Sequence, residues 1–141
     1  MKNSLRLSEI FPADSKTLFE GWLDSAMHSA YTGGQPTKIS PEIGGNFSAW
    51  DGYIFGTTLE LEPYRRIAQS WRTTEFPADA PDSHLEIIFE EKKGGTRITL
   101  IHTQLPEDQV EDYLQGWKDF YFKPMGEYYL KNKYNHVSKG I

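Results

Sequence analysis

The chain has 141 residues, a net charge of −5 and no cysteine. The length suits one domain with its own core, and we expect a single domain over residues 1–141 with a frayed tail from about residue 132. The lack of cysteine excludes disulfides and thiolate chemistry and favours the cytoplasm; the acidic charge argues against nucleic-acid binding, and no apolar run approaches a membrane span.

The first third of the chain predicts one strand and two short helices. The strand covers residues 3–10, with Leu5 and Leu7 on one face. A helix follows, capped by Asp14 or Ser15, because a short polar side chain accepts hydrogen bonds from the free amides of the first helical turn. Asp24 interrupts this helix and caps a second one that ends before the glycines at 33 and 34. Residues 37–43 are expected to form a connector.

Residues 44–72 predict three strands joined by tight turns. The middle strand alternates, so that one face carries Tyr53, Phe55, Thr57, Leu59 and Leu61. Pro63 ends this strand because proline cannot donate to a sheet ladder. The return strand, residues 65–72, has Ile67, Gln69 and Trp71 on one face.

The register of the first of these hairpins depends on its loop. A two-residue loop, Asp51 and Gly52, would place Trp50 on the face of Tyr53. A three-residue loop would instead place Phe47 on that face, beside Phe55. We favour the three-residue loop because it buries Phe47, although a slip of one residue exchanges the two faces of a strand.

The last hairpin and the last helix complete the predicted fold. The parity of residues 83–91 and 96–103 pairs Leu85 with His102 and puts the apolar side chains of both strands on one face. A long helix starts at Pro106 and is kinked at Pro124. Its apolar stripe contains Val110, Tyr113, Leu114, Trp117, Phe120, Tyr121, Pro124 and Tyr128, with Phe122 on the opposite face. This order of elements predicts an α+β fold with a six-stranded antiparallel sheet.

Several short motifs resemble those of the domains homologous to the activator of Hsp90 ATPase, within the START-like superfamily. They are Gly45 and Phe47, Asp51-Gly52-Tyr53, Gly56, Glu60-Leu61-Glu62-Pro63, Arg66-Ile67, Trp71-Arg72, Thr99-Leu100, His102, Gly116-Trp117, Tyr121 and Pro124. The resemblance spans about residues 5–134; one departure is Tyr64, where the family usually has a second proline. It implies the helix-grip fold, a curved sheet wrapped around the C-terminal helix with a cavity between.

Two polar residues on the predicted inward faces of strands have both a structural and a functional interpretation. His102 lies on the inward face near a strand end, where a neutral imidazole could act as a base or bind a ligand. Gln69 lies between Ile67 and Trp71 and needs a hydrogen-bond partner. We favour the structural interpretation for both. His84 faces away from His102, so we expect no metal site, and no phosphate-binding or nucleophile motif indicates a cofactor or a catalytic residue.

Three functions remain open at this stage. The first is a binding domain for a small apolar molecule, such as a lipid or a polyketide, without catalysis. The second, which the family resemblance implies, is interaction with an Hsp90-type chaperone. The third is an enzyme of the aromatase/cyclase kind, with His102 as its acid or base. The candidate cavity residues are Tyr53, Phe55, Gln69, Trp71, Leu100, His102, Trp117 and Tyr121.

Overall fold

The computed structural model describes residues 3–140, with side chains described as far as residue 132. Its sheet has seven strands in the order β1-β7-β6-β5-β4-β3-β2, and every neighbouring pair is antiparallel. The strands are β1 (Leu5–Phe11), β2 (Lys38–Ile39), β3 (Asn46–Ala49), β4 (Ile54–Glu62), β5 (Arg66–Thr73), β6 (Ser83–Lys92) and β7 (Gly95–Thr103). The helices are α1 (Ser15–Leu23), α2 (Ser25–Tyr31), the 3-10 turn η1 (Glu107–Gln109), α3 (Val110–Gly116), the π-helical segment η2 (Trp117–Phe122) and α4 (Lys123–Gly140).

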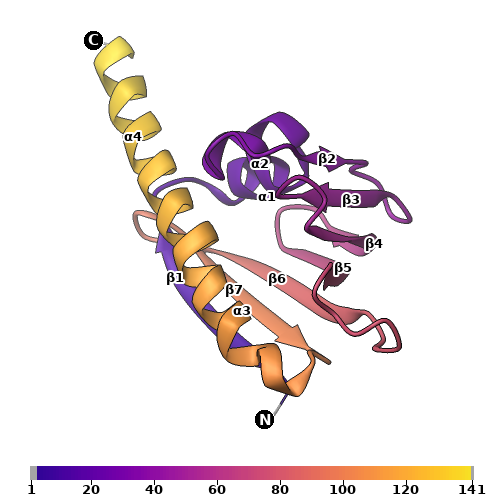
Figure 1. The fold of residues 1–141 in the computed structure, drawn as a ribbon. Helices are drawn as coiled ribbons and strands as arrows, with labels where there is room; N and C mark the ends of the chain where they lie inside the picture. The colour runs from indigo at the N-terminus through magenta and orange to yellow at the C-terminus, as the bar shows by residue number, and fades with distance from the viewer. Residues whose placement is uncertain (1–2, 141) are drawn as a thin grey trace.

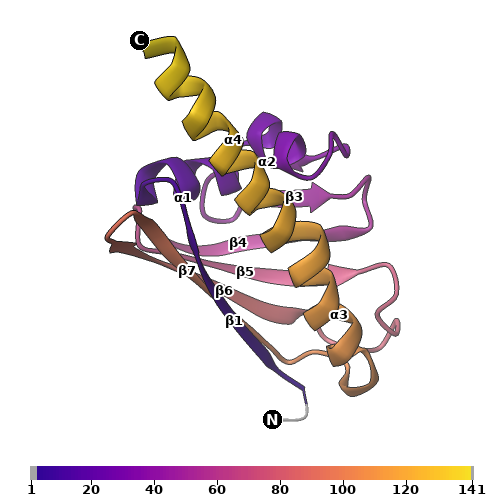
Figure 2. The same cartoon turned by 90° about the vertical axis from the view of Figure 1, so that its left-hand side faces the viewer.

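The sheet curves around the C-terminal helix, which runs from α3 through α4 along one face, with α1 and α2 at one end (Figures 1 and 2). This is the expected α+β helix-grip arrangement. The sheet has one strand more than expected, because residues 38 and 39 of the supposed connector pair with β3. The expected frayed tail falls within the last part of α4, where the side chains beyond residue 132 lie outside the described residues. Among the described helices, none is both long and apolar enough to cross a bilayer.

The two N-terminal helices begin where the sequence predicts them. Asp14 caps α1 by accepting a hydrogen bond from the backbone N–H of Thr17 at 2.8 Å. Asp24 caps α2 in the same way, accepting from the N–H of Met27 at 2.8 Å. The buried face of α1 carries Trp22 toward the middle of the sheet.

The register between β3 and β4 is that of the two-residue loop, so the favoured three-residue loop was wrong. Phe47 pairs with Gly56 and Ala49 with Ile54, and both pairs lie on the inner face. Phe55 therefore lies on the outer face, 38% exposed. The reason is local close packing: a Cβ on Gly56 would lie 2.8 Å from the ring of Phe47, so the ring covers this glycine.

A β-bulge between Thr58 and Glu60 shifts the alternation of inward and outward side chains in β4 by one residue. Thr58 is fully buried before the bulge, whereas Leu61 packs against the core after it. Leu59 stays 42% exposed, so the single uninterrupted face expected for this strand does not form.

The hairpin of β6 and β7 has the predicted register. Leu85 pairs with His102, Ile87 with Leu100 and Phe89 with Ile98. These side chains are all buried, and Phe89 packs against Phe19 of α1. In β5 the predicted inward set of Ile67, Gln69 and Trp71 is likewise buried.

The C-terminal helix is interrupted just before Pro124, as expected, and the interruption takes the form of the π-helical segment η2. A π-helical turn holds more residues than an α-helical one, so it rotates the residues that follow. Tyr113, Trp117 and Tyr121 are buried as predicted. Beyond them the buried residues are Phe122, Met125 and Tyr129 rather than Pro124 and Tyr128, and Phe120 is 58% exposed.

Candidate functional site

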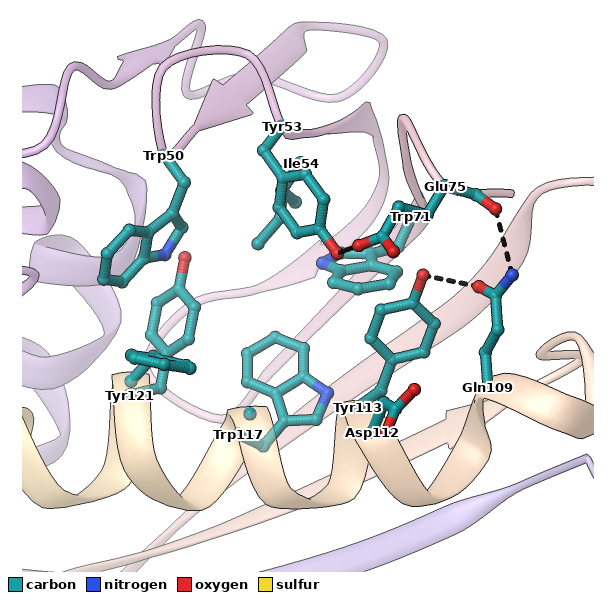
Figure 3. A pocket seen from close by; sticks show the side chains of 12 residues that line it. Trp50, Tyr53, Ile54, Trp71, Glu75, Gln109, Asp112, Tyr113, Trp117 and Tyr121 are labelled. Atoms are coloured by element: carbon teal, nitrogen blue, oxygen red, sulfur yellow. Dashed lines mark hydrogen bonds between the residues drawn. The ribbon is translucent and has the colours of Figure 1, made fainter. Parts of the chain in front are cut away.

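A cavity of about 370 Å³ lies between the C-terminal helix and the inner side of the β3–β4 hairpin and β5 (Figure 3). Its walls are mostly aromatic, and the polar groups gather at one end. The residues that line it are Trp50, Tyr53, Ile54, Trp71, Glu75, Gln109, Asp112, Tyr113, Gly116, Trp117, Phe120 and Tyr121.

Four of the predicted cavity residues do line this space. They are Tyr53, Trp71, Trp117 and Tyr121. The aromatic rings form a continuous wall: the ring centroids of Trp71 and Trp117 are 5.7 Å apart, and those of Trp117 and Tyr121 are 4.8 Å apart. Such separations are typical of favourable aromatic packing.

The other predicted cavity residues lie elsewhere. Phe55 points outward, and Leu100 is 1% exposed within the core. Gln69 and His102 are buried outside the lining of this cavity. Phe55 lies outside the cavity because of the register of its strand, and the other three lie outside it because an inward side chain can lie behind another one.

His102 is held by two hydrogen bonds behind Trp117. The indole Nε1 of Trp117 donates to Nδ1 at 3.1 Å, which leaves Nε2 to carry the proton and donate to Oγ of Ser83 at 2.8 Å. Burial, with a smaller effect of nearby His84, lowers the pKa of His102 to about 3, so the ring is neutral. This favours the structural interpretation of the histidine.

Gln69 also has its polar atoms engaged. Its Oε1 accepts from the indole Nε1 of Trp22 at 3.2 Å, and its Nε2 donates to Oγ1 of Thr58 at 3.2 Å. The amide therefore links α1 to β4 and β5 across the core. Its role in the structure is to satisfy a buried indole rather than to face the cavity.

A second buried histidine, which the sequence gave no reason to single out, supports the cavity wall. His28 donates from Nδ1 to the backbone oxygen of Trp22 at 2.9 Å and accepts at Nε2 from the hydroxyl of Tyr121 at 2.8 Å. Burial lowers the pKa of His28 to about 4 and raises the pKa of Tyr121, so this pair is uncharged. The bond fixes the ring of Tyr121 where it lines the cavity.

The polar end of the cavity is a connected set of hydrogen bonds. The hydroxyl of Tyr53 donates to the carboxylate of Glu75. Gln109 Nε2 donates to the backbone oxygen of Glu75 at 2.9 Å, and the hydroxyl of Tyr113 donates to Gln109 Oε1 at 2.6 Å. Thr73 completes the set at 2.7 Å from the Tyr113 hydroxyl. Burial raises the pKa of both tyrosines, so both remain neutral donors.

Sequence reasoning missed eight of the lining residues, and five of them fall into two groups. Tyr113 and Phe120 belonged to the predicted helical stripe, and Trp50 shared the face of Tyr53 in the loop that was not favoured. Glu75 and Gln109 come from a loop and a helix start, where no periodic pattern exists to reveal that they meet. Among the residues that the structure describes, no three histidine, aspartate or glutamate side chains are close enough to hold a metal ion.

The curved antiparallel sheet, the helix that it grips and the aromatic cavity between them define a START-like helix-grip protein. The chain belongs to the family described as Activator of Hsp90 ATPase homolog 1-like protein, whose model matches residues 12–129. It is 26% identical over 119 residues to the Activator of 90 kDa heat shock protein ATPase homolog 1 of Mus musculus. That match covers 84% of this chain and 35% of the relative, so the chain spans about a third of the length of this curated relative.

Solved structures share the same fold. An HSP90 activator from Plasmodium falciparum has a TM-score of 0.74 at 19% identity, covering 83% of this chain and 88% of that one. CalU16 from Micromonospora echinospora has a TM-score of 0.72 at 25% identity, covering 89% of this chain and 73% of that one. The same fold thus occurs in proteins that are described differently, and function has to be argued from the site.

Proposed function

We propose that this protein binds a small, mainly apolar molecule in the cavity between the sheet and the C-terminal helix. The observation that carries the proposal is the cavity itself: its volume of about 370 Å³ and its aromatic lining suit a small-molecule site. Ligand pockets generally span about 300–1,000 Å³ and combine apolar walls with a few convergent polar groups. Glu75, Gln109 and Asp112 supply those polar groups at one end.

The walls of the cavity are held in place by the hydrogen bonds behind them. Trp117 is tied to His102, and Tyr121 is tied to His28. Rings fixed in this way lose little conformational freedom when a ligand enters, which lowers the entropic cost of binding. A pre-formed aromatic site is therefore a better interpretation of this region than a core that packs loosely.

Gly116 offers a direct test of the proposal. It lines the cavity, and a Cβ placed on it meets only Phe120 at ordinary van der Waals distance, so Gly116→Leu would fill the cavity from the helix. Gly126→Leu is the matched control, because Gly126 has open space around its Cβ and lines a different groove of the same helix. Replacing either glycine should also favour the helix, by up to about 1 kcal/mol.

The measurement is a thermal-shift and tryptophan-fluorescence screen with fatty acids, sterols, polyketides and flavonoids. A ligand should raise the Tm in a concentration-dependent way, because it binds only the folded state. It should also change the emission of Trp71 and Trp117, which line the cavity. Gly116→Leu should weaken this binding at least tenfold, and Gly126→Leu should leave it unchanged. Binding that survives Gly116→Leu undiminished would overturn the proposal, and so would the absence of binding by every class of small molecule tested, cationic molecules included.

A second candidate function is interaction with an Hsp90-type chaperone. The observation that favours it is the similarity to relatives that are described as activators of the 90 kDa heat shock protein ATPase. Since this chain spans only about a third of their length, the activity of the whole relative is a separate question. Titration of the purified protein against an Hsp90-type chaperone, with ATPase rate and binding both measured, tests this function independently of the cavity.

The aromatase/cyclase alternative rests on an acid or base within the cavity. His102 was the candidate, but its two ring nitrogens are engaged by Trp117 and Ser83. His102→Gln should accordingly leave ligand affinity within a few-fold. A hundredfold loss of affinity or of turnover, at an unchanged Tm, would favour the enzyme over the binding protein.

A further inference from the structure

We infer that the ligand of this cavity carries a positive charge, as an amine or a quaternary ammonium group, at the end formed by Glu75 and Asp112. This inference rests on the proposed function and adds the chemical class of the ligand to it. It follows from three features of the same cavity: the charges at its polar end, the rings beside them and the direction of the hydrogen bonds.

The polar end of the cavity is acidic. Glu75 follows β5 and Asp112 belongs to α3, and Figure 3 shows their side chains near Gln109 at the same end of the cavity. Of the described residues that line the cavity, none is basic. Both residues are exposed, so these carboxylates lie at the mouth of the cavity, and without a basic partner in the lining they give that mouth a negative potential.

The walls next to these carboxylates are aromatic faces. Tyr53, Trp71 and Tyr113 lie beside Glu75 and Asp112, and the ring centroids of Trp71 and Tyr113 are 5.2 Å apart. A cation within about 6 Å of such a ring is attracted by the ring quadrupole. Rings and carboxylates together are the groups that proteins use to hold ammonium ligands.

The hydrogen bonds of the polar end argue against an anionic ligand. An anion needs donors, and the two tyrosine hydroxyls and the Gln109 amide at this end each donate a hydrogen bond within the protein. The hydroxyl of Tyr53 donates to the Glu75 carboxylate, and that of Tyr113 donates to Gln109. The amide Nε2 of Gln109 donates to the backbone oxygen of Glu75. A cation requires none of these donors, so it can enter without breaking them.

Three probes with the same aromatic body separate charge from shape. They are (2-naphthylmethyl)trimethylammonium, its neutral isostere 2-neopentylnaphthalene and the anion 2-naphthylacetate. Their dissociation constants for the full chain should be measured by tryptophan fluorescence at low and at high salt. We expect the cation to bind about tenfold tighter than the neutral isostere, the anion to bind weakest, and only the affinity of the cation to fall as salt is raised.

Single substitutions then locate the charge. Glu75→Gln keeps an oxygen that can accept from Tyr53, and Asp112→Asn keeps the size of the side chain. Each should weaken the cation about threefold to tenfold while leaving the neutral isostere unchanged. Glu111→Gln is the matched control, because Glu111 is an exposed acid on the same helix that does not line the cavity, and it should change neither affinity.

Different results would overturn the positive charge of the ligand and the proposed apolar binding site. Equal or tighter binding of the neutral isostere, with Gly116→Leu still blocking it, would overturn the positive charge and leave the apolar site standing. Tightest binding of 2-naphthylacetate would overturn the positive charge as well. If none of the three probes binds and the wider ligand screen is also silent, both the inference and the proposed function fail.

Discussion

The indole of Trp117 donates its hydrogen bond to Nδ1 of His102 at 3.1 Å, so a ring that lines the cavity also satisfies a fully buried histidine. The chain of hydrogen bonds continues beyond the histidine. Its Nε2 donates to the hydroxyl of Ser83, which in turn donates to the backbone oxygen of Trp71 at 2.6 Å. Two walls of the cavity are therefore joined through the core behind them. A substitution in either wall should therefore change the free energy of unfolding of the whole domain.

Trp117→Ala tests this connection. It should lower the free energy of unfolding by about 3–5 kcal/mol, because it removes a buried aromatic ring. It also leaves Nδ1 of His102 without its donor. Urea unfolding measures the loss, and Phe120→Ala serves as the control, since Phe120 is 58% exposed on the same π-helical segment. A loss below about 1 kcal/mol for Trp117→Ala would contradict the packing of this helix against the sheet.

The stability of the protein should decline in mild acid because two histidines are buried in the neutral form. The pKa of His102 is lowered to about 3 and that of His28 to about 4, while an unfolded histidine titrates near 6.5. Between these values the unfolded state binds more protons than the folded state. The stabilisation is thus complete above about pH 6.5 and is lost as the pH falls toward 4 and 3.

His102→Gln isolates one of the two contributions. The difference in unfolding free energy between the wild type and this variant should shrink by about 1.5 kcal/mol from pH 6.5 to pH 5. Chemical denaturation at a series of pH values measures it. Acidic groups with lowered pKa values, such as Asp14, lose stability in both proteins and cancel in the difference. Parallel curves for the two proteins would show that His102 titrates normally in the fold.

Local signals in the sequence were sufficient where one element decides its own structure. Asp14 and Asp24 cap helices through bonds to residues three positions ahead, so the sequence contains both partners. The β6–β7 register follows from a short loop and two apolar sets that must share a face. The order of elements, and with it the helix-grip fold, could be predicted for the same reason.

Sequence reasoning failed where distant segments decide the outcome. The inner face of β4 depends on the ring of Phe47 covering Gly56, and two loop lengths were open until that contact was known. The helical stripe assumed one period throughout, whereas η2 changes the period within the helix. Glu75 and Gln109 meet only because the loop after β5 lies against the start of the C-terminal helix. The sequence therefore allowed the prediction of site residues on strands and helices, but not of those in loops.

Gly56→Ala tests the corrected register. A Cβ at this position would lie 1.9 Å from the backbone oxygen of Ser70 and 2.8 Å from the ring of Phe47, so the strands would have to move apart. We expect a loss of at least about 1–3 kcal/mol of unfolding free energy. Gly126→Ala is the control, because Gly126 has open space in a helix and its replacement should stabilise by up to about 1 kcal/mol. A neutral Gly56→Ala would indicate that the other register is present.

The hydroxyl of Tyr129 should be a source of instability rather than of stability. The side chain is 5% exposed, and within the described residues its Oη has no hydrogen-bond partner. A buried unsatisfied hydroxyl costs about 1–3 kcal/mol, so Tyr129→Phe should raise the unfolding free energy by about 1 kcal/mol. Tyr128→Phe, on the half-buried neighbour, should change it by less than about 0.5 kcal/mol.

Gly21 provides the matching half of a double-mutant cycle. A Cβ on Gly21 would lie 2.6 Å from the Tyr129 hydroxyl and 3.0 Å from Met27, so Gly21→Ala should destabilise the wild type despite its better helix propensity. In the Tyr129→Phe background the nearest obstacle is gone, and the same change should become neutral or stabilising. We expect a coupling energy of about 0.5–3 kcal/mol from denaturant unfolding of the four proteins, and none with Tyr128→Phe. Additive effects of Gly21→Ala and Tyr129→Phe would mean that α1 and α4 do not meet at this hydroxyl.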